Sequence, residues 1–115
     1  MDITQWLAMF QQAWASRNVE AVILLFSDEV EYWETPFQQL ASLEDVKNEW
    51  QVIREQKDIN ISTRLFASDN NMHSVTWQLT YTDQSGEQQN WAGTYLIVLN
   101  ERGECTYFHQ TGETA

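Results

Sequence analysis

The sequence predicts one α+β domain in which a layer of three N-terminal helices covers one face of a bent antiparallel sheet, in the order α-α-β-α-β-β-β-β. The hydrophobic spacing supports this fold class, because it changes from steps of three and four residues to strict alternation after about residue 55. The length of 115 residues suits a single domain over 1–115. Six Trp residues and 43% hydrophobic residues exclude a disordered acidic chain.

The first two predicted helices follow one another closely. In the first, Asp2 and Gln5 form the pattern of a capping box at its start. Its apolar residues recur on one face, and they are Ile3, Trp6, Leu7, Phe10 and Trp14. The second is predicted from Val19 to Phe26, with Asn18 as its N-cap. This segment is apolar nearly all round, so we expect it to be buried on more than one side.

A short strand and a third helix come next. Val30–Thr35 is rich in β-branched and aromatic residues and stops at Pro36, which predicts a strand. Ser42 and Asp45 then give the Ser-x-x-acid pattern of a helix start. The apolar stripe of this helix consists of Leu43, Val46, Trp50 and Ile53.

The rest of the chain is predicted to form strands joined by polar turns. Apolar and polar residues alternate in 59–67 and 73–81, with a turn between them. Residues 91–99 are apolar on both faces, which favours a central or interface strand. The last strand is predicted over 105–110. Because so many strands cannot all lie behind three helices, the sheet must curl.

Charge and cysteine content exclude several classes of function. Seventeen acidic residues against six basic ones give a net charge of -11, whereas a nucleic acid or an anionic lipid surface requires clustered Lys and Arg. We therefore expect neither a nucleic-acid nor a membrane partner. The single Cys105 cannot form an internal disulfide, and the acidic N-terminal segment does not read as a signal peptide. A cytoplasmic location is the resulting expectation.

The order of these elements and several segments resemble the nuclear-transport-factor-2-like superfamily, in particular its small SnoaL-like members. The segments that carry the resemblance are Phe10–Trp14, Leu25–Tyr32, Thr35-Pro36-Phe37, the helix with Val46 and Trp50, Tyr95–Cys105 and Phe108. The resemblance covers essentially the whole chain. It implies a cone-shaped fold whose wide end opens into a pocket, and a homodimer formed through the outer sheet face. It does not imply one function, because the superfamily includes ketosteroid isomerases, scytalone dehydratases, polyketide cyclases, transport factors and non-enzymatic ligand binders.

Two positions depart from the pattern of the enzymes in this superfamily. The isomerase-like members carry an Asp directly before the proline that closes the first strand, where this chain has Thr35, with Glu34 one residue earlier. Alternation places Glu34 and Thr35 on opposite faces, so Glu34 replaces that Asp only if a bulge shifts the register. Close small relatives also end their last strand with an acidic and aromatic run, whereas here Phe108 is followed by His109, Gln110 and Thr111.

The aromatic residues predict both a core and a pocket. Most indoles occupy apolar positions of their elements, so filling the core is their simplest role. Taking the location of the family pocket as a guide, we expect the lining to include Trp14, Trp33, Phe37, Trp50, Trp91 and Tyr95. Such a wall would bind a flat or apolar small molecule, and the hydroxyl of Tyr32 or Tyr95 would orient it.

Glu34 is the candidate for acid–base chemistry, with Tyr32 or Tyr95 as hydrogen-bond donor. Among indoles and Phe37 its pKa would rise, which suits a general acid or base; the alternative is an exposed glutamate at a strand edge. The only two histidines, His73 and His109, share strand faces with apolar residues. They lack the spacing of a metal site, so we predict no metal ion. Without a Gly-rich phosphate loop, we predict no cofactor.

Three hypotheses follow for the function. The preferred one is a SnoaL-like domain that binds a small apolar or aromatic molecule. The second is an enzyme of the proton-transfer kind, such as an isomerase, dehydratase or cyclase, which uses Glu34. The third is a dimeric interaction module whose acidic surface meets a basic partner.

Overall fold

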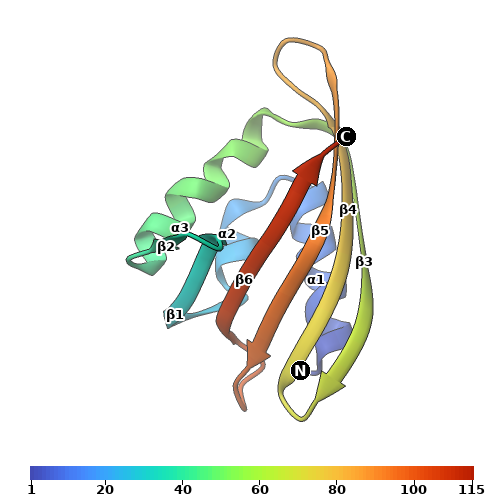
Figure 1. Ribbon diagram of the computed structural model, residues 1–115. Coiled ribbons are helices and arrows are strands. Elements are labelled where there is room, and N and C mark those ends of the chain that lie inside the picture. Colours follow the sequence, from blue (N-terminus) through green and yellow to red (C-terminus); the bar gives the residue numbers. More distant parts are fainter.

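Three α-helices cover one face of a curved six-stranded sheet, which confirms the α+β prediction (Figure 1). The computed structural model describes residues 1–115. The elements are α1 (Ile3–Ala15), α2 (Val19–Ile23), β1 (Phe26–Thr35), β2 (Gln38–Leu40), α3 (Leu43–Trp50), the 3-10 helix η1 (Gln51–Glu55), β3 (Lys57–Asp69), β4 (Met72–Thr82), β5 (Gln88–Leu99) and β6 (Cys105–Thr114). The sheet bends around the helices, as Figure 1 shows from its edge.

Local hydrogen bonds explain where the helices begin. The Gln5 backbone N–H donates to Asp2 Oδ1 at 2.8 Å and the Asp2 N–H donates to Gln5 Oε1 at 3.0 Å, which confirms the capping box. The side chains of Asn18 and Ser42 cap α2 and α3, each by accepting a hydrogen bond from one backbone N–H of the first turn. The second helix is shorter than predicted, because it ends at Ile23 and Phe26 already opens β1.

The strand order is β2-β1-β6-β5-β4-β3, and the last four strands form the predicted antiparallel meander. The prediction of an entirely antiparallel sheet is wrong at one pair, because β1 lies parallel to β6. Hydrophobic alternation shows which face a residue takes but carries no information on the direction of a neighbour far away in the sequence. The short strand β2 was not predicted either; it forms a hairpin with the end of β1.

The core lies between the helices and the concave face of the sheet. At its centre, the Phe108 ring lies 4.9 Å from the Tyr32 ring and 4.8 Å from the Tyr95 ring, measured between centroids. Towards the N-terminal end of α1, Trp6 stacks on Phe10 at 5.1 Å. All five of these rings are at most 1% exposed, so this part of the aromatic set fills the core as the sequence predicts.

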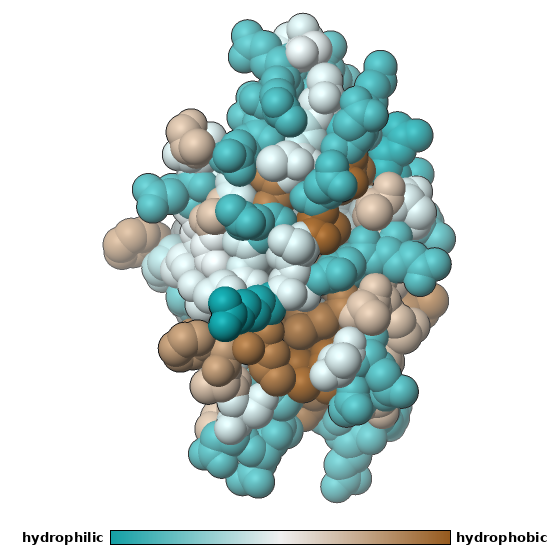
Figure 2. All heavy atoms as spheres, turned by 90° about the vertical axis from the view of Figure 1, so that its right-hand side faces the viewer, coloured by the Kyte–Doolittle hydropathy of each residue, from teal (hydrophilic) through white to brown (hydrophobic).

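The convex face of the sheet carries no helices. Figure 2 shows this side, where apolar side chains form a continuous region among hydrophilic ones. A shallow groove near the β3–β4 turn is lined in part by Met72, Leu96 and Tyr107, of which Met72 is 52% and Leu96 43% exposed. None of the helices has the length and apolar composition that crossing a membrane requires.

Candidate functional site

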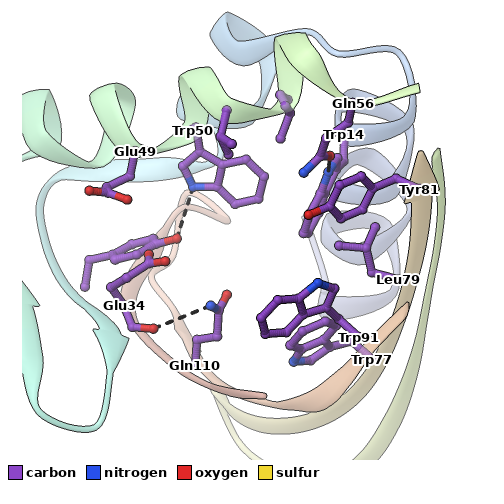
Figure 3. A pocket seen from close by; sticks show the side chains of 13 residues that line it. Trp14, Glu34, Glu49, Trp50, Gln56, Trp77, Leu79, Tyr81, Trp91 and Gln110 are labelled. Carbon is purple, nitrogen blue, oxygen red and sulfur yellow. Dashed lines mark hydrogen bonds between the residues drawn. The ribbon is translucent and has the colours of Figure 1, made fainter. Parts of the chain in front are cut away.

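A cavity of about 340 Å³ opens between the end of α1, the α3–η1 segment and the sheet (Figure 3). Its size falls at the lower end of the roughly 300–1,000 Å³ typical of small-molecule sites. Nine of its 13 lining residues are hydrophobic. The lining consists of Trp14, Tyr32, Glu34, Glu49, Trp50, Val52, Ile53, Gln56, Trp77, Leu79, Tyr81, Trp91 and Gln110.

The helical wall of the cavity is held by two paired indoles. The rings of Trp14 and Trp50 meet edge to face, with centroids 4.8 Å apart. Trp14 Nε1 donates to Gln56 Oε1 at 2.9 Å, and Trp50 Nε1 donates to the Tyr32 hydroxyl at 3.0 Å. Because their polar tips are paired inside the protein, these rings form a fixed wall.

The sheet side of the cavity contains polar atoms without partners. Trp77 stacks on Tyr95 at 5.3 Å with an angle of 11° between the rings, and Trp91 lies next to Trp77 in Figure 3. Trp77 Nε1, Trp91 Nε1 and the Tyr95 hydroxyl are buried and have no hydrogen-bond partner. Buried donors that lack partners cost free energy and are uncommon in folded proteins. This wall therefore has donors that lack an acceptor.

Glycine makes room for this wall. Trp77 pairs with Gly93 on β5, and Gly93 pairs in turn with Gly112 on β6. A Cβ atom on Gly112 would lie 2.5 Å from Cζ2 of Trp77, closer than atoms can approach. The indole therefore keeps its position under the cavity only while position 112 has no side chain.

Glu34 points into the cavity from β1 (Figure 3). Its neighbour two residues earlier, Tyr32, faces the same side, as alternation requires. The pairing with β2 shifts between Trp33 and Thr35, so Glu34 is the extra residue of a bulge.

Burial determines the ionisation of the polar groups around Glu34. Desolvation raises the pKa of the Glu34 carboxyl, and the negative charge of Glu49 raises it further. Burial also raises the pKa of the Tyr32 and Tyr95 hydroxyls well above their usual value, with Glu34 adding to the shift. The carboxyl is thus poised to exchange a proton closer to neutral pH than an exposed glutamate, while both phenols keep their protons.

The structure brings together most of the residues proposed from the sequence. The lining contains Trp14, Tyr32, Glu34, Trp50 and Trp91. Tyr95 lies in the fully buried layer against Trp77 rather than in the lining itself.

Trp33 and Phe37 are not placed in the lining. Trp33 lies between two inward-facing residues of β1, and its Nε1 donates to Glu31 Oε2 at 2.8 Å on the opposite face. Phe37 follows Pro36 in the β1–β2 turn and is 97% exposed. Residue type alone suggests burial for both, but Trp33 takes the other face of β1 and Phe37 lies in a turn.

Sequence reasoning did not single out several lining residues. Trp77 and Tyr81 share the inward face of β4 with Leu79, so their alternation was the available signal. Gln110 lies two residues after the buried Phe108 on β6, a spacing that also points inward. The remaining missed residues are Glu49, Val52, Ile53 and Gln56, and only the fold brings them here.

The two histidines lie outside the cavity. The Nδ1 atom of His73 lies 2.7 Å from the Ser68 hydroxyl at the β3–β4 turn, while His109 stacks on Tyr107 at 6.4 Å. No three His, Cys, Asp or Glu side chains gather in a way that could hold a metal ion. Burial raises the pKa of the Cys105 thiol to about 12, so it is not a nucleophile at neutral pH.

The curved sheet, its helical cover and the cavity between them define a cone-shaped α+β domain with an internal pocket. Residues 6–108 match the family model of the SnoaL-like domain, and the chain therefore belongs to this family. The expected relationship to the nuclear-transport-factor-2-like superfamily is thereby confirmed. No curated protein sequence matches the chain significantly.

Several solved structures share the fold at low sequence identity. The Δ5-3-ketosteroid isomerase from Mycobacterium sp. aligns with a TM-score of 0.81 and 11% identity over 98% of both chains. An NTF2-like protein of unknown function from Exiguobacterium sp. 255-15 aligns with a TM-score of 0.77 and 18% identity, covering 96% of this chain and 97% of the other. RV0760c from Mycobacterium tuberculosis in complex with estradiol-17beta-hemisuccinate has a TM-score of 0.79 and 14% identity, covering 93% and 90%.

Proposed function

We propose that the protein catalyses a cofactor-independent proton transfer on a small, largely apolar molecule held in the aromatic cavity. One observation supports this above all others: the Glu34 carboxyl points into a cavity whose walls are mostly hydrophobic. A binding site for an apolar molecule needs no buried carboxyl, whereas an isomerase, dehydratase or cyclase needs a group that accepts and returns a proton. The sequence hypothesis that this residue is an exposed strand-edge glutamate loses its support.

In this proposal Glu34 takes a proton from a carbon next to a carbonyl group and later returns it to another atom of the same molecule. The Tyr32 hydroxyl already accepts a hydrogen bond from Trp50 Nε1 at 3.0 Å, so its own proton is available for a substrate oxygen. That hydrogen bond stabilises the negative charge which develops on the oxygen. The ketosteroid isomerase and the polyketide-cyclase relative on the same fold are consistent with this chemistry.

Deuterium exchange tests the proposal without knowledge of the natural substrate. A set of cyclic and aromatic ketones is incubated with the protein in D₂O, and NMR follows the loss of the C–H signals next to the carbonyl. We expect the wild type to accelerate exchange in at least one ketone and Glu34→Gln to abolish it. Glu31→Gln is the matched control, because Glu31 lies on the same strand and faces the other side. Exchange that persists in Glu34→Gln contradicts the proposal.

Binding without turnover is the second candidate, favoured by the unpartnered Nε1 atoms of Trp77 and Trp91, two residues that line the cavity. A ligand with hydrogen-bond acceptors would pair these donors without any proton transfer. Tryptophan fluorescence and thermal shifts with aromatic and polyketide-like compounds test this candidate. Stabilisation by a compound that undergoes no exchange favours a binding protein over an enzyme.

We also propose that two copies associate through the apolar region of the convex sheet face. Met72 and Leu96 are exposed there, and a continuous apolar surface of this kind is typical of an association site. Light scattering coupled to size-exclusion chromatography should give a dimer for the wild type and a monomer for Leu96→Lys. A wild-type monomer at high protein concentration contradicts this proposal. The cytoplasmic location expected from the sequence stays a prediction.

A further inference from the structure

The cavity carries negative charge that no lining residue compensates. Glu34 and Glu49 both contribute to the lining, and none of the 13 lining residues is Lys or Arg. The two carboxyl groups are close enough for the charge of Glu49 to disfavour ionisation of Glu34. Figure 3 shows both on the same side of the cavity, Glu49 from α3 and Glu34 from β1. An anionic ligand would add to this repulsion, whereas a cation would relieve it.

The aromatic rings that line the cavity together with these carboxyl groups suit a cation as well. In Figure 3, Trp50 extends from α3 beside the two carboxyl groups, and Trp91 and Tyr81 line the opposite side of the cavity. The face of an aromatic ring attracts a positive charge, with Trp the most effective residue, and the attraction increases where water is excluded. An enclosure of rings and carboxylates is the chemistry by which proteins bind ammonium groups.

We propose that the natural ligand of this pocket carries a protonated amine on an apolar ring body, with the amine held on the side of Glu34 and Glu49. This inference rests on the proposed function, since it assigns the substrate class of the same pocket. The buried, unpartnered Trp91 Nε1 lies across the cavity and would donate to an oxygen at the other end of the ligand.

The amine also has a consequence for the acid–base group. A positive charge next to Glu49 offsets the repulsion which that carboxylate exerts on Glu34. Binding of the correct ligand therefore favours the ionised form of Glu34, which is the form able to accept a proton. A neutral ligand of the same shape would bind the pocket without this effect.

Three matched probes test the charge preference: naphthylmethylamine, naphthylmethanol and naphthoate. They share one ring system and differ in the charge of the substituent. Isothermal titration calorimetry on the full-length protein at neutral pH should show the amine binding roughly tenfold more tightly than the alcohol, and the carboxylate more weakly than either. Glu49→Gln should reduce the preference for the amine over the alcohol several-fold.

Glu44→Gln is the matched control for Glu49→Gln. Glu44 is exposed in the first turn of α3 and does not line the cavity, so its substitution removes the same charge from the same helix. An alcohol that binds as tightly as the amine overturns the inference and leaves the proposed function standing. Failure of all three probes to bind contradicts both. An equal loss of amine preference in Glu44→Gln and Glu49→Gln assigns the effect to the net charge of the protein and also overturns the inference.

Discussion

The two ends of the aromatic core differ in how their polar tips are satisfied. At the closed end, Trp6 is fully buried and its Nε1 donates to the Leu25 carbonyl at 3.0 Å. Around it pack Phe10, Phe26 and Phe108, which have no polar atoms in their side chains. At the open end, the Nε1 atoms of Trp77 and Trp91 are buried without partners next to a cavity.

This difference separates residues that hold the fold from residues that serve a site. Both ends use the same residue types on inward-facing positions, so composition and periodicity describe them alike. At the closed end the buried indole N–H has a hydrogen-bond partner, which favours stability. The open end keeps unpaired donors and a carboxyl with a raised pKa, which cost stability and are retained where a ligand or a reaction needs them.

The largest effect is expected for Phe108→Ala at the closed end. Phe108 is fully buried and meets the rings of Trp6, Phe10, Phe26, Tyr32 and Tyr95. Its loss should lower the free energy of unfolding by about 3–5 kcal/mol, measured by urea denaturation. Trp91→Ala should cost clearly less, because its ring already borders open space. Equal losses would show that the two ends do not differ in packing.

Gly112→Ala should affect the open end through Trp77. The added methyl group would lie 2.5 Å from Trp77 Cζ2 and must displace the indole, at a cost of about 1–3 kcal/mol in unfolding free energy. Probe affinity should fall at the same time. In a Trp77→Phe background the same substitution should cost much less, because the smaller ring removes the clash. A double-mutant cycle measures this coupling, and a coupling energy near zero would contradict it.

Two matched Trp→Phe substitutions compare the polar tips directly. Trp6→Phe removes a paired N–H and leaves a small void, so it should cost about 1–2 kcal/mol in urea denaturation. Trp91→Phe removes an unpaired donor, so its cost should be close to zero. If Trp91→Phe destabilises the protein as much as Trp6→Phe, the two ends do not differ in hydrogen bonding.

Much of the fold could be predicted from the sequence because local signals are strong in this chain. The capping patterns at Asp2 and Ser42 and the change from helical spacing to alternation identify all three helices and five of the strands. The parallel pairing of β1 with β6 could not be predicted, because it joins segments more than 70 residues apart and leaves no local trace.

The site could be predicted only from the position of each residue in its strand, because alternation decides which face of the sheet a side chain takes. Alternation correctly places Glu34 on the same face of β1 as Tyr32. It also places Trp33 on the opposite face, so the indole alone does not make Trp33 a lining residue. Glu49 is exposed in the structure, and only the packing of α3 beside the cavity brings it next to Glu34.

A small effect is expected for Glu34→Gln, and its size depends on pH. Below the ordinary glutamate pKa of 4.5, Glu34 is protonated in both the folded and the unfolded chain, so Gln should be nearly neutral. As pH rises through the raised pKa of the folded state, the native protein is penalised for a charge that the unfolded chain bears freely. Glu34→Gln should therefore be the more stable protein at pH 7, and its advantage should vanish on acidification.

Glu20→Gln provides a control with the opposite sign. The Glu20 backbone and the Arg54 guanidinium, 3.1 Å away, lower the pKa of this carboxyl, so its charge stabilises the folded state. Its replacement should reduce stability at pH 7, and this difference should shrink as pH falls through the lowered pKa. Both variants remove one negative charge from a protein of net charge -11, so the overall field changes equally. Thermal unfolding between pH 3 and pH 8 measures the stability of both variants relative to the wild type. If this difference changes with pH in the same way for both variants, the pKa of Glu34 is not raised by its position at the open end, and the prediction is wrong.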